Sequence, residues 1–201
     1  MIKTYLIICS LISLCINSNI LNANKDFNIN YNLHNDNQLN VSINLGEITF
    51  SSTSFNNEEF IRMNSQGAYH SKEIGTPELL QFNQLIEIPH NADIRIEILS
   101  LEYSEFDLTE LYPNTKIYPV QHPRPKSGNN NLIFEYNQTI YNENKFIEKE
   151  LVEVLHNGKM REVEIGNLII NPIKYNPQQN KIKIYHNIEF IVHFDNSNID
   201  S

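Results

Sequence analysis

Apolar and polar residues alternate with a period of two along much of this chain. Val41, Ile43 and Leu45 flank polar residues, and the same spacing returns over residues 94–98 and 188–194. This alternation is typical of a β-strand that buries one face and exposes the other. Several such strands, separated by short segments with Gly, Pro and Asn, predict an all-β fold, either an antiparallel β-sandwich or a barrel.

The clearest local unit lies near the C-terminus. Residues 168–175 form an apolar run interrupted by Asn171-Pro172, and a second apolar pattern covers residues 181–185. The turn between them contains Pro177, which fixes its own φ, and Asn180, a residue type that adopts positive φ readily. We predict a β-hairpin here, with Pro172 at a sheet edge or a bulge.

Two segments lack a clear strand pattern. Residues 142–154 are rich in Glu and Lys and carry Phe146 and Val154 at helical spacing, which fits a short helix or a charged loop over the sheet. Residues 24–40 are polar and rich in asparagine, so we expect a loosely held lead-in. We interpret the abundance of asparagine and isoleucine as a compositional bias without functional content.

The N-terminus has the three parts of a secretory signal peptide. A basic start at Lys3 precedes an apolar run over residues 5–16 and a polar stretch that ends at Ala23. The run is short for a membrane span, so we expect cleavage near Ala23 and no stable span afterwards; a retained anchor is the alternative. The mature chain is then secreted, periplasmic or at the cell surface.

Both cysteines of the chain, Cys9 and Cys15, lie inside this removable segment. The exported part would have no disulfide, no thiolate nucleophile and no Cys-ligated metal. The formal net charge is −9, and no cluster of Lys and Arg is longer than a pair. This acidic balance disfavours nucleic acid and anionic membranes as partners.

Catalytic and cofactor motifs are missing from the sequence. It has no Gly-rich phosphate loop, no Gly-x-Ser-x-Gly elbow and no His-Glu-x-x-His pair, and its seven histidines are isolated. We therefore expect no cofactor and no metal site. An active peptidase is a weak option, because no triad pattern supplies a nucleophile other than cysteine.

A basic loop is the one unusual feature. Residues 112–131 contain four prolines, and Pro123 and Pro125 lie on either side of Arg124, one of only four arginines in the chain, with Lys126 next. Proline fixes its own φ and keeps the preceding residue extended. We predict an extended, exposed loop, which is either simply solvated or a peptide-like segment that docks in the cleft of another protein.

From about Gly46 to Phe194 the chain resembles the N-terminal prodomain of the gingipain-type cysteine peptidases, family C25. The blocks that carry this resemblance keep their order and spacing: Gly75-Thr76-Pro77-Glu78-Leu79, Ile86-Glu87-Ile88-Pro89, Tyr118-Pro119-Val120-Gln121, Glu150-Leu151-Val152, Met160-Arg161, Gly166, and Asn171-Pro172-Ile173-Lys174-Tyr175-Asn176-Pro177. Leu80 and Ile147-Glu148 depart from the family pattern, which leaves the identity of the partner open.

The resemblance implies a β-sandwich prodomain that assists the folding of a gingipain-like catalytic domain, in cis or in trans, and blocks its active site. Arg124, with Lys126 as second choice, would mimic the basic residue of a substrate, and Pro123 and Pro125 would resist cleavage. In the family the Cys/His catalytic domain follows this module. We therefore expect a prodomain without an enzyme of its own, either a stand-alone inhibitor or chaperone or a truncated gene product.

The expected organisation is a signal peptide over residues 1–23, a lead-in and first strand over 24–45, the prodomain-like β-sandwich over 46–195 and a tail over 196–201. A different class of function stays open, a secreted β-sandwich that binds glycan or a cell surface. The ten tyrosines of the chain could stack on sugars, although packing in the core or at its rim suffices for the five at strand-like positions: Tyr103, Tyr136, Tyr141, Tyr175 and Tyr185.

Overall fold

The computed structural model describes residues 20–21, 27–35, 37–123 and 133–197. In this part of the chain nearly all regular structure is β-strand, and the two helices are single turns. The elements are β1 (Ile20–Leu21), β2 (Asn28–Asn35), β3 (Gln38–Asn44), β4 (Ile48–Phe55), β5 (Glu58–Ser65), β6 (Tyr69–His70), β7 (Leu80–Ile88), β8 (Asp93–Asp107), α1 (Leu108–Leu111), β9 (Lys116–Ile117), α2 (Gln138–Tyr141), β10 (Val152–Met160), β11 (Val163–Ile170), β12 (Ile173–Asn176) and β13 (Lys181–Asp195).

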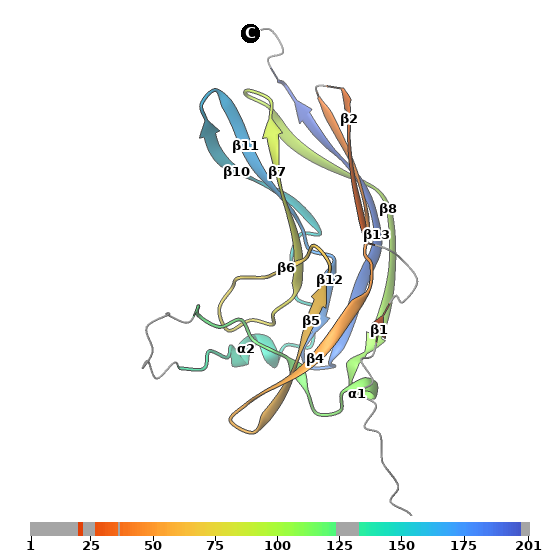
Figure 1. The fold of residues 1–201 in the computed structure, drawn as a ribbon, viewed down its shortest axis with the longest axis vertical. Coiled ribbons are helices and arrows are strands. Elements are labelled where there is room, and N and C mark those ends of the chain that lie inside the picture. Colours follow the sequence, from red (N-terminus) through yellow and green to blue (C-terminus); the bar gives the residue numbers. More distant parts are fainter. Residues whose placement is uncertain (1–19, 22–26, 36, 124–132, 198–201) are drawn as a thin grey trace, which may run out of the picture.

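The strands form three sheets packed as an open β-sandwich. One sheet has the order β10-β11-β7-β6, and a second has β1-β4-β5-β9. The third has β12-β13-β3-β2, in which β12 and β3 share one edge of β13 and β8 pairs with its other edge. Figure 1 shows the β10-β11-β7 layer facing the β2, β3, β13 and β8 layer, with the β4–β5 hairpin at the lower end. Among the described strand pairs, only β5 with β9 is parallel. The prediction of an antiparallel all-β sandwich is confirmed.

The core between the layers is built from the apolar positions of the alternating segments. Val41 and Ile43 of β3 are buried, as are Ile188, Phe190 and Val192 of β13. These side chains belong to one hydrophobic cluster that also includes residues of β4, β5, β7, β11 and β12. Burial of apolar surface is the main favourable term in folding, and here a single core receives it from all three sheets.

The predicted C-terminal hairpin is confirmed, and its interruption has a definite role. β12 pairs antiparallel with β13, and Asn180 in the turn has φ +53°. Before the break, β11 pairs with β10 and β7 in a different sheet. Asn171-Pro172 therefore marks the point where the chain crosses from one sheet to another, and not a bulge within one strand.

The structure differs from the expected lead-in. β2 pairs with β3 from Asn28 to Asn35, so this part of the 24–40 segment is a strand of the third sheet. The sequence Asn28-Ile29-Asn30-Tyr31 does alternate, but asparagine is rare in strands and hides the pattern.

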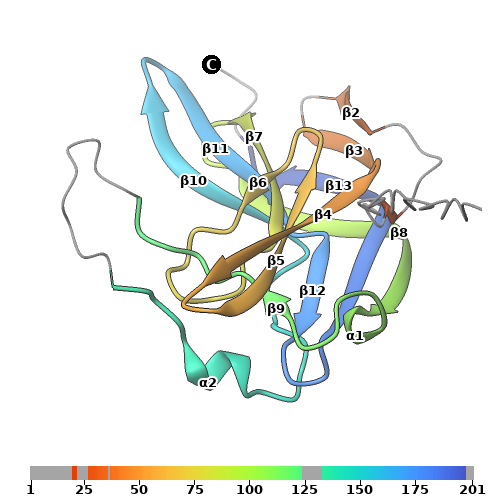
Figure 2. The same ribbon diagram turned by 60° about the horizontal axis from the view of Figure 1, so that its bottom comes forward.

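Of the two readings of residues 142–154, the loop is the one that the structure shows. Residues 142–151 contain no helix or strand, the single turn α2 precedes them, and β10 starts at Val152. Figure 2 shows this segment leaving α2 beneath β12. Cys9, Cys15 and the predicted signal peptide up to residue 19 lie outside the described residues. Within the described residues no helix has the length and apolarity needed to cross a membrane.

A charged cluster joins the tips of β7, β10 and β11. The carboxylate of Glu164 lies 3.1 Å from His156 Nε2, 2.8 Å from His90 Nδ1 and 3.2 Å from Lys159 Nζ. The hydrogen bonds from His156, His90 and Lys159 lower the pKa of Glu164 from 4.5 to about 2. A group whose pKa is lowered in the folded state stabilises that state above its unfolded pKa.

We predict that the contribution of Glu164 to stability is fully present from pH 4.5 to about 6 and is lost as the pH falls towards about 2. Thermal unfolding of the wild type and of Glu164→Gln, measured by calorimetry from pH 2 to 6, checks this: the two melting temperatures should converge at the acid end. Glu162→Gln, a change at an exposed neighbour, is the control. Parallel curves for wild type and Glu164→Gln across the whole range contradict the assignment.

Candidate functional site

The predicted basic loop leaves the sandwich beside β5 and β9, and the structure describes its two flanks. Pro123 is the last described residue of the first flank and is exposed, and the second flank begins at Ile133. Arg124, Pro125 and Lys126 lie outside the described residues. The structure therefore describes the base from which this segment departs.

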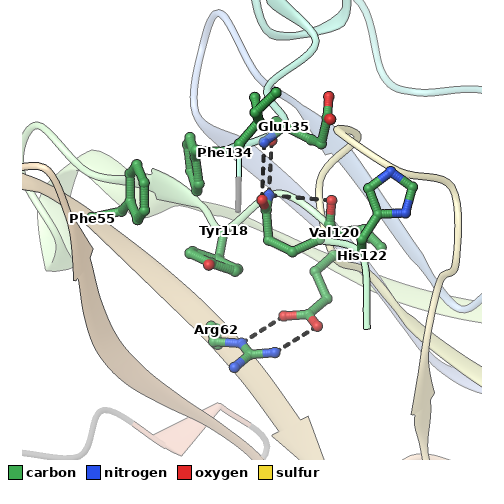
Figure 3. Close-up of a pocket in the computed structure, with 10 residues that line it drawn as sticks. Phe55, Arg62, Tyr118, Val120, His122, Phe134 and Glu135 are labelled. Carbon is green, nitrogen blue, oxygen red and sulfur yellow. Dashed lines mark hydrogen bonds and ion pairs between the residues drawn. The ribbon is translucent and has the colours of Figure 1, made fainter. Parts of the chain in front are cut away.

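The side chain of Gln121 joins the two flanks. Its Nε2 donates to the carbonyl oxygen of Glu135 at 2.8 Å, and its Oε1 accepts from the backbone N–H of Glu135 at 3.0 Å. Nε2 also lies 3.0 Å from the carbonyl oxygen of Pro119. The amide of Gln121 thus acts as an extra peptide group, pairing with residue 135 as a neighbouring strand would (Figure 3).

Backbone hydrogen bonds fix the first flank to the sandwich. Tyr118 N–H donates to Ile61 O at 2.8 Å, and Tyr118 O accepts from Glu78 N–H at 2.9 Å. Val120 N–H donates to Thr76 O at 2.9 Å and its carbonyl accepts from Gly75 N–H at 2.8 Å. Residues 118–120 are therefore held between β5 and the segment before β7, although they belong to no strand.

Aromatic stacking fixes the second flank. The Phe134 ring stacks on Phe55 with centroids 4.1 Å apart, and it lies 5.9 Å from the ring of Tyr118. Tyr136 stacks on Tyr141, also at 4.1 Å. The Tyr141 hydroxyl donates to Ile117 O at 2.6 Å in a buried position, and burial raises its pKa. Such pairs add to the stability that area burial provides.

A cavity of about 670 Å³ opens between the two flanks. Its floor is an ion pair, in which Arg62 Nε lies 2.6 Å from Glu78 Oε2 and Nη2 lies 2.7 Å from Oε1. The hydrogen bond to Glu78 raises the pKa of Arg62, and the guanidinium also lies 5.1 Å from the centre of the Tyr118 ring. The described lining residues include no Ser, Thr or Cys, the usual nucleophiles of hydrolases. They are Phe55, Arg62, Glu78, Tyr118, Val120, Gln121, His122, Ile133, Phe134 and Glu135.

The structure also places tyrosines and a histidine that the sequence offered as candidates. Tyr141 and Tyr175 are buried. Tyr103 is exposed, and the Lys183 ammonium lies over its ring, 4.5 Å from the ring centre. His193 is buried, with its Nε2 2.8 Å from Glu97 Oε2. Across the described ranges, no group of three His, Cys, Asp or Glu side chains is arranged to hold a metal ion.

Sequence reasoning missed the role of Gln121, which it quoted only within a motif, and it did not single out Ile133 or Phe134. The contact of Gln121 with residue 135 spans a gap of 14 residues that no periodicity reports. The cluster of Phe134 and Tyr136 close behind the proline-rich segment was the available signal.

We predict that Gln121→Ala loosens the base of the loop. The change leaves the N–H and C=O of Glu135 without their partner, which costs about 1 kcal/mol at this half-buried position. The free energy of unfolding from urea titration should fall by that amount, and limited proteolysis should cut more quickly between residues 121 and 135. Gln84→Ala removes an exposed glutamine amide as control. Equal cleavage rates for the two variants would show that Gln121 does not organise the base.

Comparison with known proteins gives one family. The family model Propeptide_C25 matches residues 21–200. Lys-gingipain HG66 and Lys-gingipain W83, both of Porphyromonas gingivalis, are 30% identical to the chain over 158 residues. Each alignment covers 78% of this chain and 9% of the relative, so the chain spans about a tenth of the length of these curated relatives.

Two solved structures share the fold. A chain from "Structural insight into zymogenic latency of gingipain K from Porphyromonas gingivalis" superposes with a TM-score of 0.79 and 26% identity, covering 89% of this chain and 98% of that one. A chain from "Complex of Porphyromonas gingivalis RgpB pro- and mature domains" gives a TM-score of 0.72 and 18% identity, covering 84% and 86%. At that identity the second likeness concerns the fold alone.

Proposed function

The chain belongs to the C25 propeptide family, and on this premise we propose that it binds the catalytic domain of a gingipain-like cysteine peptidase, assists its folding and blocks its active site. The segment between Gln121 and Glu135 is the proposed inhibitory element. Arg124, or Lys126 as second choice, enters the pocket that receives the basic residue of a substrate, and Pro123 and Pro125 slow cleavage of the bound segment.

The observation that carries this proposal is the fixed base of the loop. The Gln121–Glu135 hydrogen bonds and the Phe134–Phe55 stack hold both flanks, so the segment begins and ends at fixed points of the sandwich. A binding segment with fixed ends and internal prolines loses less conformational entropy on docking than a free peptide does. This supports a role in which the segment is presented to a cleft.

Two of the solved structures with this fold support the choice of partner. One structural neighbour is a complex of pro- and mature domains, and another concerns zymogenic latency. The described part of this chain supplies a prodomain fold, so the catalytic domain comes from elsewhere, in cis or in trans. We further propose export by residues 1–23. The proposed inhibitory unit is the β-sandwich, which includes β2 and β3 as well as residues 46–195.

The experiment is inhibition in trans. Residues 24–201 are titrated against the mature domains of Lys-gingipain and RgpB, and Ki is measured for the parent, Arg124→Ala, Lys126→Ala and the double variant. Loss of a buried charged anchor costs about 2–5 kcal/mol, which is roughly a thirty-fold to several-thousand-fold rise in Ki. The single variants decide which of the two residues is the anchor.

Arg161→Ala is the matched control, because Arg161 is exposed in the β10–β11 turn, on an edge of the sandwich away from the loop. It should inhibit like the parent. If both loop variants also inhibit like the parent, or if the parent inhibits neither mature domain, the proposed inhibitory role is wrong.

A further inference from the structure

Ile133 is exposed to an unusual degree for an apolar residue. Its side chain is 80% exposed, the highest value among the exposed large hydrophobic side chains of the described residues. Single exposed apolar residues are common on protein surfaces and need no explanation by themselves. The position of Ile133 beside the fixed base of the loop is what sets it apart.

The backbone that carries Ile133 is fixed on its C-terminal side. Its neighbour Phe134 is stacked on Phe55 at 4.1 Å, and the next residue, Glu135, is paired with Gln121 through both its N–H and its C=O. Isoleucine is branched at Cβ and has few rotamers. An exposed, stiff side chain on a fixed backbone loses little entropy when a partner covers it, which is the property of an anchor residue.

Ile133 also lines the mouth of the cavity between the two flanks, together with Phe55, Tyr118 and Phe134. The rim therefore combines one projecting aliphatic side chain with three aromatic rings that are already packed against each other. Figure 3 shows Phe55, Tyr118 and Phe134 grouped on one side of the cavity, next to Glu135.

We propose that Ile133 is a second anchor for the catalytic domain, packing into an apolar depression on the surface of that domain beside its specificity cleft. This inference rests on the proposed inhibitory function and adds the chemistry of a second contact. The catalytic domain is the partner expected at Ile133, because the proposed inhibitory segment and Ile133 share one base. A partner surface that receives this segment also covers Ile133. A basic anchor gives charge recognition, and Ile133 gives apolar burial.

The test uses residues 24–201 and the same inhibition assay. Covering an isoleucine side chain fully corresponds to roughly a ten- to hundred-fold gain in affinity, so Ile133→Ala should raise Ki by that factor and Ile133→Asp by more. Ile133→Leu keeps the apolar volume and should retain most of the inhibition. The melting temperatures of all three should equal that of the parent, because the side chain is exposed.

Leu85→Ala and Leu85→Asp are the matched controls, because Leu85 is 62% exposed and lines a separate groove with Leu33 and Tyr31. They should leave Ki unchanged. If Ile133→Asp inhibits like the parent while the Arg124 and Lys126 variants fail, the second anchor is wrong and the inhibitory loop stands. If the loop variants and Ile133→Asp all inhibit like the parent, the proposed function itself is overturned. An equal loss for Leu85→Asp and Ile133→Asp would also overturn the specific role of Ile133.

Discussion

The pairing of β13 on both of its edges is the constraint on which the rest of the structure depends. β8 pairs with it from Lys181 to Asp195, and the opposite edge is divided between β12 and β3. The register shifts near His186 and at Glu189–Phe190, where extra residues bend the ladder and increase its twist. In Figure 1 this strand runs the length of the sandwich, so both halves of the core share one surface. The described residues include no cysteine, so burial in this shared core stabilises their fold without a disulfide.

Asparagine has a structural use in this chain that the initial interpretation as compositional bias overlooked. Among the described residues, six of the seven non-glycine positions with positive φ are asparagines, and the whole chain has only six glycines. Asparagine tolerates the left-handed region because its short polar side chain bonds locally. Buried asparagines also join separate segments: Asn180 accepts from the Tyr175 hydroxyl and donates to Thr115 O, and Asn171 bonds Gln81 and Glu150. The bias therefore supplies turns and cross-links that glycine and cysteine supply elsewhere.

The sequence was informative where a local rule applies. Alternation at residues 188–194 predicted a strand of the core, and Asn180 predicted a turn with positive φ; both follow from side-chain period and backbone sterics alone. β2 was missed because asparagine at its polar positions masks a regular alternation. The role of Gln121 could not be predicted, since its partner Glu135 is brought near by tertiary contacts, among them the packing of Phe134 against Phe55 and Tyr118. Pro123 and Pro125 predicted an exposed loop, and what the structure adds is the set of tertiary contacts that hold its two described flanks.

The choice of a side chain to close the loop has a geometric consequence. Directly paired strands lie about 4.8 Å apart, whereas a glutamine side chain between two backbones holds them farther apart. The flanks at Gln121 and Glu135 are therefore joined without being drawn into a narrow hairpin, and the gap between them is the cavity floored by Arg62 and Glu78. A wide base presents two edges to a partner, one leading to Pro123 and one carrying Ile133. A narrow hairpin would offer a single tip, and its affinity would depend on one side chain. With a wide, fixed base, charge recognition and apolar burial can occur at two separate points, while the conformational entropy of the base is lost only once, on folding. This is the physical reason to expect a two-point contact here.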